Sequence, residues 1–258
     1  MRFASLGSGS RGNALVVSHE KTHLLIDCGL PFKTIKSRLE ELNLRPNDLD
    51  AVFVTHEHGD HIGGLATLDR KTDLDIFMSE GTAYESGWHE SPSVEFIRDG
   101  ELKDYGPFQI EPVIVPHDAR EPCQFVVTAR GYRQSETRRL GVLTDLGSDS
   151  AHVVEAYQDC DALVLECNHD VDLLQQGSYP PTLKARVGGD WGHLNNEQAA
   201  SLLEKIRSIE LQWLALAHIS EQNNSIEIAT DTIKQVFVEQ HRTVVAKQVG
   251  GFDWLDIE

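Results

Sequence analysis

The chain has 258 residues, with 23 Lys and Arg against 41 Asp and Glu, which gives a formal net charge of −18. Hydrophobic residues make up 40% and charged residues 25%, a globular composition that excludes a disordered or fibrous chain. The negative charge argues against a protein that covers nucleic-acid backbone with a broad basic face.

The sequence carries no signal for secretion or membrane insertion. Residues 1–7 lack a basic segment followed by an apolar one, and no stretch approaches 18 uninterrupted apolar residues. The cysteines are spread without CxxC spacing, which indicates unpaired thiols. We therefore expect a cytoplasmic protein that does not bind a membrane. The sequence gives no indication of the oligomeric state.

Apolar runs and apolar alternation predict ten strands. They cover residues 1–6, 13–18, 23–27, 51–55, 75–78, 107–115, 123–129, 140–144, 162–166 and 211–217. Helical spacing of apolar residues predicts helices over 32–42, 199–206 and 226–237. No repeat or linker divides the chain, so we expect one α/β (α+β) domain over residues 1–258, with helices outside two sheets.

Residues 7–12 (GSGSRG) match the GxGxxG pattern of dinucleotide-binding turns, and Asp27 follows at the expected distance. Such a turn must open a helix that holds the pyrophosphate. Residues 14–17 are instead apolar and partly β-branched, and another strand follows. We therefore expect a strand, a loop and a second strand here, and no nucleotide cofactor.

The strongest motif is HxHxDH, formed by His56, His58, Asp60 and His61 directly after a predicted strand. Twelve histidines in 258 residues do not explain this cluster by composition. Imidazoles together with carboxylates suit Zn²⁺, Mn²⁺ or Fe, whereas Mg²⁺ and Ca²⁺ prefer oxygen ligands alone. Because neighbouring positions on one loop point in different directions, we expect two ions, each completed from elsewhere.

Three residues at other predicted strand ends can complete the two sites. His117, Asp145 and His218 each follow an apolar run. Singly, such residues are more often turn or cap residues, but their recurrence at one topological position indicates a shared site.

With these motifs the chain resembles the metallo-β-lactamase superfamily. The resemblance implies a four-layer αβ/βα sandwich with a metal site along one edge. It implies that His56, His58 and His117 bind the first ion, that Asp60, His61 and His218 bind the second, and that Asp145 bridges them. It also implies that Asp27 hydrogen bonds beneath the site.

The segments GSGSRGN (7–13), ECNHD (166–170), GHLNN (192–196) and HISEQNN (218–224) resemble the WalJ/YycJ-like branch. That branch implies a binuclear phosphodiesterase or nuclease, in its most specific form a 5′–3′ DNA exonuclease, with a hydroxide bridging the two ions as nucleophile. The alternatives are a glyoxalase-II-like or lactonase-like hydrolase of a small thioester or ester, and a metal-binding module without turnover.

Asp60 and His193 are the candidate catalytic residues. His193 precedes a predicted helix, where it can protonate a leaving alkoxide or bind a phosphate oxygen; the alternative is a structural histidine. Ser10, Asn13, His169 and His193 are the candidates for substrate binding.

Basic residues outside these motifs offer a second set of candidates. Arg130, Arg133, Arg138 and Arg139 lie between two predicted strands, and a solvated loop is favoured over contact with nucleic-acid backbone. Lys184 and Arg186 are similar candidates. Since two divalent ions would bring positive charge to one cleft, we expect nucleic acid to bind locally and in a metal-dependent way.

Overall fold

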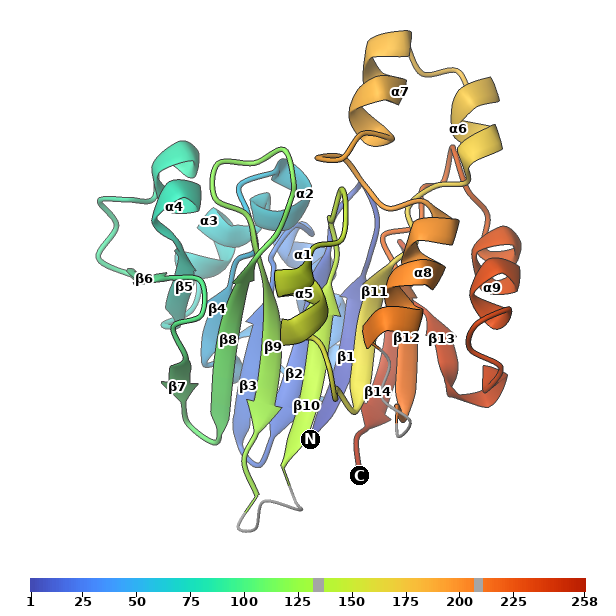
Figure 1. Ribbon diagram of the computed structural model, residues 1–258. Helices are drawn as coiled ribbons and strands as arrows, with labels where there is room; N and C mark the ends of the chain where they lie inside the picture. The colour runs from blue at the N-terminus through green and yellow to red at the C-terminus, as the bar shows by residue number, and fades with distance from the viewer. Residues whose placement is uncertain (132–136, 207–210) are drawn as a thin grey trace.

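The computed structural model describes residues 1–131, 137–206 and 211–258, and these residues form two β-sheets of seven strands each. The first sheet has the order β14-β1-β2-β3-β4-β5-β6 and the second β13-β12-β11-β10-β9-β8-β7 (Figure 1). In each sheet, four strands at one side are antiparallel neighbours, and the rest of the sheet continues in parallel pairs.

The strands of the first sheet are β1 (Arg2–Gly7), β2 (Ala14–His19), β3 (Thr22–Ile26), β4 (Ala51–Phe53), β5 (Asp75–Ser79), β6 (Val94–Ile97) and β14 (Phe252–Asp256). Those of the second are β7 (Lys103–Tyr105), β8 (Phe108–Ile114), β9 (Cys123–Ala129), β10 (Arg138–Leu143), β11 (Ala162–Glu166), β12 (Trp213–Ala217) and β13 (Thr243–Val245).

The helices lie in the connections between parallel strands, because parallel neighbours need a crossover connection. They are α1 (Phe32–Glu41), α2 (Gly59–Ile62), α3 (Leu65–Asp69), α4 (Glu80–Ser86), α5 (Ala151–Ala156), α6 (Val171–Gln176), α7 (Pro181–Val187), α8 (Asn196–Ile206) and α9 (Ile226–Lys234). Short 3₁₀ helices lie at Pro46–Asp48 and Gln240–Arg242. None of the helices in the described ranges is long and apolar enough to cross a membrane.

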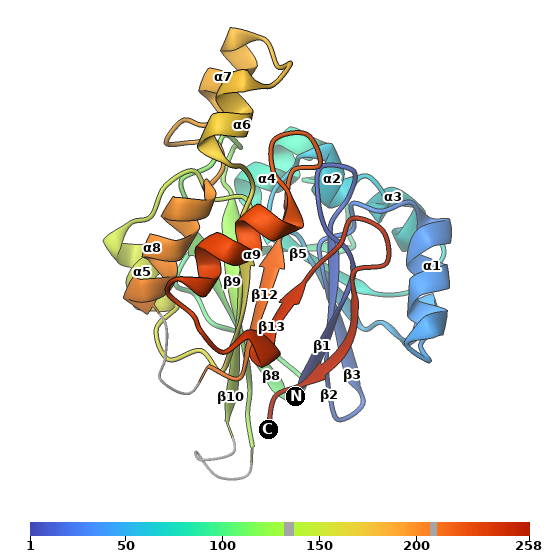
Figure 2. The same cartoon turned by 90° about the vertical axis from the view of Figure 1, so that its right-hand side faces the viewer.

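The layers follow the order helix, sheet, sheet, helix. Figure 2 places α1 and α3 outside the first sheet and α5 and α8 outside the second. A buried apolar cluster joins each helical layer to its sheet. The expected four-layer α/β fold is therefore confirmed.

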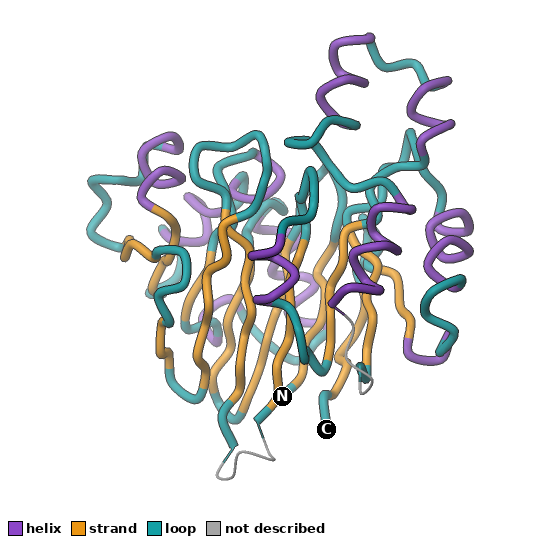
Figure 3. The backbone as a smooth tube through the Cα atoms, in the orientation of Figure 1, coloured by secondary structure: helices purple, strands orange, loops and turns teal. Residues whose placement is uncertain are grey.

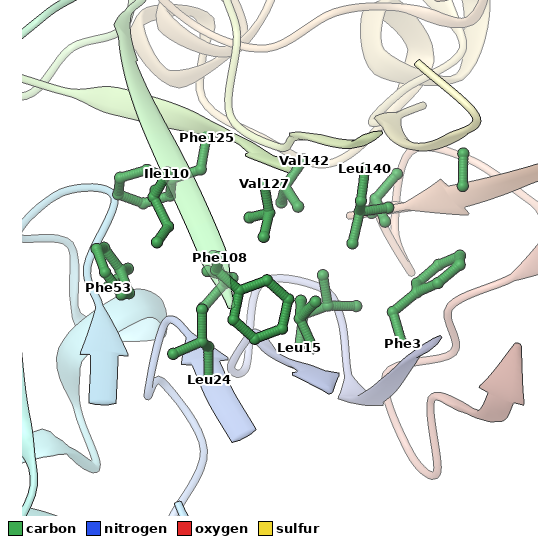
Figure 4. Close-up of a cluster of buried hydrophobic side chains, with 14 of the residues drawn as sticks. Phe3, Leu15, Leu24, Phe53, Phe108, Ile110, Phe125, Val127, Leu140 and Val142 are labelled. Carbon is green, nitrogen blue, oxygen red and sulfur yellow. The ribbon is translucent and has the colours of Figure 1, made fainter. Parts of the chain in front are cut away.

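A third apolar cluster fills the space between the two sheets (Figure 4). Phe53 stacks on Phe77 with 4.5 Å between ring centroids, and it meets Phe125 of the facing sheet edge-on at 5.8 Å. Aromatic pairs of this geometry add to the free energy gained by burial. The cluster fixes the two sheets face to face, and with them the loops at their ends.

All ten predicted strands are present, with ends shifted by up to two residues. The four strands that the sequence pattern missed are β6, β7, β13 and β14, which are the edge strands of the two sheets. Most of their residues are half-buried or exposed, so they lack the apolar runs of the central strands. The GSGSRG segment lies between the antiparallel strands β1 and β2, so the expected strand, loop and strand are confirmed.

We predict that Phe53→Ala lowers the free energy of unfolding by about 3–5 kcal/mol, because it leaves a cavity between the sheets. Phe96→Ala on the edge strand β6, where the side chain is 38% exposed, should cost about 1 kcal/mol or less. Urea unfolding followed by circular dichroism measures both. Equal losses would contradict the role assigned to the cluster between the sheets.

Candidate metal centre

The predicted ligands come together at one end of the two sheets, beyond the carboxyl ends of the strands. The parallel register aligns Leu143 of β10 with Leu165 of β11, and Leu165 with Leu216 of β12, so the loops after these strands start at one level. Figure 3 shows loops gathered at this end, opposite the two termini. Asp27 follows β3, residues 56–61 follow β4, His117 follows β8, Asp145 follows β10 and His218 follows β12.

Three of these residues have a backbone conformation that side chains rarely adopt. Asp27, Asp145 and His218 lie in the left-handed region, with φ of 60°, 60° and 52°. Each occurs where a strand gives way to its loop. Such strain persists where the surrounding structure determines it, and it is concentrated at functional sites.

A first donor group consists of three imidazoles. His58 Nδ1 lies 3.0 Å from His56 Nε2 and 3.3 Å from His117 Nε2. His117 Nδ1 donates a hydrogen bond of 2.9 Å to the carbonyl oxygen of Gly192, so its Nε2 keeps a lone pair for the group.

A second donor group consists of Asp60, His61 and His218. Asp60 Oδ2 lies 3.6 Å from His61 Nε2 and 3.5 Å from His218 Nε2. The Asp145 carboxylate lies beside both imidazoles, with Oδ2 2.8 Å from His61 Nε2 and Oδ1 2.9 Å from His218 Nδ1. Because Asp145 also forms a donor group with His56 and His61, it lies where the two groups meet.

Asp27 supports the second group from below. His61 Nδ1 lies 2.7 Å from Asp27 Oδ2, and the backbone N–H and hydroxyl of Thr55 donate to the same carboxylate. This contact directs His61 Nε2 toward Asp60 and Asp145. The structure thus brings Asp27 into the position expected from the sequence.

The backbone of Gly29 packs against that of Asp60 too closely for a side chain at position 29. A Cβ atom there would lie 1.7 Å from the carbonyl oxygen of Asp60. Cys28 N also donates to the His61 carbonyl oxygen at 2.7 Å, and Asn13 N to that of Asp60 at 2.8 Å. The loops after β3 and β4 are thereby held together, which fixes Asp60 and His61.

The donor atoms fit a divalent transition metal. In a tetrahedral zinc site with Zn–N distances of about 2.0–2.1 Å, ligand nitrogens lie roughly 3.3 Å apart, close to the separations in the first group. Asp145 Oδ2 is buried and makes no hydrogen bond of acceptable geometry, although it lies 2.8 Å from His61 Nε2. A buried carboxylate oxygen that converges with imidazole nitrogens without hydrogen bonding is arranged as a ligand of a common cation.

Asp145, His61 and His218 shift one another's pKa values. Burial alone would raise the pKa of Asp145, but the His218 and His61 imidazoles hold it well below its ordinary value. Burial lowers the pKa of His61 and His218, and the Asp145 carboxylate more than offsets this, so both pKa values are well above the ordinary one. Both imidazoles therefore hold a proton more tightly than a free imidazole does.

Glu166 is the site residue that sequence reasoning missed. It ends β11, its side chain is buried, and its Oε1 lies 2.7 Å from His193 Nδ1. Oε2 accepts backbone hydrogen bonds from Leu146 and Leu194. Burial raises the pKa of Glu166, but His193 lowers it to about 2. The sequence did contain a signal for Glu166 as a site residue, since it ends a predicted strand just as Asp145 and His218 follow predicted strands.

A cleft of about 340 Å³ opens over the two donor groups. His58, Asp60, Asp145 and His218 line it. The predicted substrate residues Ser10 and His193 line it too. The segment that contains α6 and α7 stands above this end of the sheets in Figures 1 and 2, and it contributes Tyr179, Leu183, Arg186 and Val187 to the cleft.

Asn13 and His169 lie outside the residues that line the cleft. The Asn13 amide packs against the second donor group, with Nδ2 3.1 Å from His61 Nε2, and its Oδ1 accepts from Ser8 Oγ and Gly9 N. His169 is 2% exposed, and burial lowers its pKa to about 4. The structure therefore gives Asn13 a supporting position, and it does not bring His169 to the cleft.

Arg130 and Arg139 lie at the other end of their strands from the donor groups. Arg130 follows β9, and Arg139 is near the start of β10, whereas Asp145 follows the end of β10. Arg130 pairs with Asp104 at 2.8 Å, and Arg139 Nη2 donates to the carbonyl oxygen of Ala156. Arg133 lies outside the described residues. Arg130 and Arg139 are thus held by intramolecular partners, away from the candidate metal centre.

Comparisons with known proteins agree with this geometry. The sequence profile of the Metallo-beta-lactamase superfamily matches residues 7–164. The exodeoxyribonuclease YycJ of Bacillus anthracis is 36% identical over 244 residues, which cover 93% of this chain and 90% of that protein. The exodeoxyribonuclease WalJ of Streptococcus pneumoniae is 37% identical over 239 residues, which cover 90% and 86%.

A solved structure gives the same result for the fold. The metallo-beta-lactamase fold protein YhfI from Bacillus subtilis superposes with a TM-score of 0.74 at 17% identity, covering 99% of each chain. At this identity the likeness concerns the fold alone. Together with the sequence relatives, it confirms the resemblance predicted from the motifs.

We predict that metal binding releases protons at neutral pH and that the apparent affinity for Zn²⁺ rises with pH. The raised pKa values of His61 and His218 mean that bound protons must leave before these nitrogens coordinate a metal. Calorimetric titration in two buffers of different ionisation enthalpy measures the release. His152→Ala removes an imidazole that pairs with Asp99 outside the donor groups. This variant should release as many protons and bind Zn²⁺ with the same affinity as the unchanged protein. An affinity independent of pH would contradict the prediction.

Proposed function

The chain belongs to the metallo-β-lactamase superfamily, and on that basis we propose that it is a metal-dependent nuclease that hydrolyses phosphodiester bonds, with exonuclease action on DNA as its specific activity. The observation that carries the proposal is the pair of adjoining His/Asp donor groups beneath one open cleft. The names of the two bacterial relatives support DNA as the substrate.

We propose that the centre holds two divalent ions, Zn²⁺ or Mn²⁺, with Fe as the other candidate. His56, His58 and His117 would hold one ion, Asp60, His61 and His218 the other, and Asp145 would contact both. When bound, such ions lower the pKa of water toward neutrality and polarise a phosphoryl oxygen.

We propose that Asp60 orients the attacking water. Its side chain lines the cleft, and its Oδ2 faces the imidazoles of His61 and His218. Burial raises the pKa of Asp60, but hydrogen bonding from His218 and the charge of His61 bring it below the ordinary value. The ionised carboxylate can accept a hydrogen bond from water in the cleft.

We propose that His193 protonates the leaving group. Its Nδ1 is bound to Glu166, so Nε2 is the nitrogen available to the cleft that the side chain lines. Burial lowers the pKa of His193, and the buried Glu166 carboxylate raises it above the ordinary value. A protonated imidazole at this position can give its Nε2 proton to a departing alkoxide. Glu166 acts through His193 as a positioning residue.

The cleft favours a phosphodiester over the small esters and over binding without turnover. Asp60, Asp118 and Asp145 line it together with Arg186 and three imidazoles, so bound ions would add the positive charge that a phosphate requires. Metal-dependent, local binding of a polyanion is compatible with the net charge of −18. We also propose that residues 1–258 act as one domain, because one apolar cluster joins both sheets.

We predict that the metal-loaded protein hydrolyses duplex DNA and bis(p-nitrophenyl) phosphate and leaves S-lactoylglutathione intact. Asp60→Ala should lower the rate on both phosphodiesters by at least about 100-fold, since it removes both a donor atom and the water contact. Gel assays and absorbance measure the rates, with His152→Ala as the control.

Turnover of the thioester alone would contradict the nuclease proposal and favour the small-ester alternative. A fully metallated protein without activity on any of the three substrates would favour a binding module. Cleavage only within the DNA strand would contradict exonuclease action.

We predict that His193→Ala retains the metal content of the unchanged protein and lowers kcat on DNA by about 10²–10⁴-fold. The loss should be smaller with bis(p-nitrophenyl) phosphate, because its leaving group needs little protonation. Elemental analysis and steady-state kinetics test both statements. Metal loss in this variant would instead make His193 a ligand or a structural residue.

A further inference from the structure

An ion pair ties helix α7 to the loop of the candidate metal centre. Arg186 of α7 pairs through Nε with Oδ2 of Asp118, the residue directly after His117. The other oxygen of Asp118 faces the first donor group, 3.4 Å from His117 Nε2 and 3.9 Å from His58 Nε2. Arg186 is therefore held close to the position at which the proposed reaction takes place.

The Arg186 guanidinium is available to a ligand. Its side chain is 58% exposed, and within the described ranges its polar atoms make no hydrogen bond or ion pair other than that with Asp118. Among the described residues that line the cleft, it is also the single Lys or Arg. A guanidinium has five N–H donors in a planar fork, so most of its capacity is unused.

The same segment brings an aromatic ring to the cleft. Tyr179 precedes α7 and lines the cleft together with Leu183, one turn before Arg186. A cleft lined by both an arginine and an aromatic residue has the combination that binds single-stranded nucleic acid, the guanidinium at phosphate and the ring at a base.

We propose that Arg186 and Tyr179 form a subsite for the nucleotide next to the cleaved bond, with Arg186 binding its phosphate and Tyr179 stacking on its base. The inference rests on the proposed nuclease function. In the free protein the Arg186 guanidinium pairs with the Asp118 carboxylate. The substrate phosphate replaces that carboxylate as the partner of Arg186. A small phosphodiester without a second phosphate cannot use this subsite.

Lys184 provides the matched control on the same helix. Its ammonium donates to the carbonyl oxygen of Gln175 at 2.6 Å, and it is not among the residues that line the cleft. Removing Lys184 takes the same charge from α7 without touching the subsite.

The experiment compares the metal-loaded protein with Arg186→Ala, Arg186→Lys, Tyr179→Ala and Lys184→Ala. The readout is kcat/KM on a single-stranded oligonucleotide divided by kcat/KM on bis(p-nitrophenyl) phosphate. We expect this ratio to fall about 10- to 100-fold in Arg186→Ala, as for a lost hydrogen bond to a charged group. Tyr179→Ala should also lower the ratio, Arg186→Lys should restore part of it, and Lys184→Ala should leave it unchanged.

Binding provides a readout that needs no turnover. In the metal-loaded His193→Ala background, in which turnover is slow, fluorescence anisotropy gives the affinity for the same oligonucleotide as a function of salt. Arg186→Ala should reduce the slope of log affinity against log salt by about 0.7, the value for one phosphate contact on a single strand. Lys184→Ala should keep the slope of the unchanged protein.

Two results would overturn the proposal. Equal losses on both substrates in Arg186→Ala would place Arg186 at the reacting phosphate or in support of the metals. Equal effects of Arg186→Ala and Lys184→Ala would mean that both residues act only through the positive charge that they give to α7. If the unchanged, metal-loaded protein hydrolyses neither substrate, the nuclease function fails, and the salt slopes of the metal-loaded variants still decide whether Arg186 contacts phosphate.

Discussion

Neutralisation of buried negative charge is the constraint on which the site depends. Asp27, Asp145 and Glu166 are at most 3% exposed. Their partners in the described ranges are imidazoles, a hydroxyl and backbone N–H groups rather than Lys or Arg. Burying a carboxylate is costly unless positive charge accompanies it. The carboxylates favour positive charge on the neighbouring imidazoles, whose pKa values they raise, and divalent ions can supply that charge instead.

The architecture holds these groups where such an exchange is possible. The apolar cluster around Phe53 fixes the two sheets face to face, and the parallel register brings the loops after β10, β11 and β12 to one level. The left-handed conformations of Asp27, Asp145 and His218 store strain that this packing sustains.

The sequence predicted the central strands and the seven proposed metal ligands, because both depend on strong local patterns. It missed the edge strands β6, β7, β13 and β14, whose exposed residues carry little apolar signal. It also missed Glu166 as a partner of His193. A glutamate at the end of a strand has the same sequence pattern whether its side chain is buried or exposed, and only the tertiary structure distinguishes the two. The contact of Asn13 with His61 joins loops far apart in sequence, so the sequence alone does not indicate it.

The central claim is that two adjoining ions are bound by the two donor groups. The most direct measurement is an anomalous difference map from a crystal soaked in Mn²⁺. Two peaks are expected, one among His56, His58 and His117 and one among Asp60, His61 and His218, with Asp145 between them. A single peak, or peaks away from these side chains, would contradict the claim.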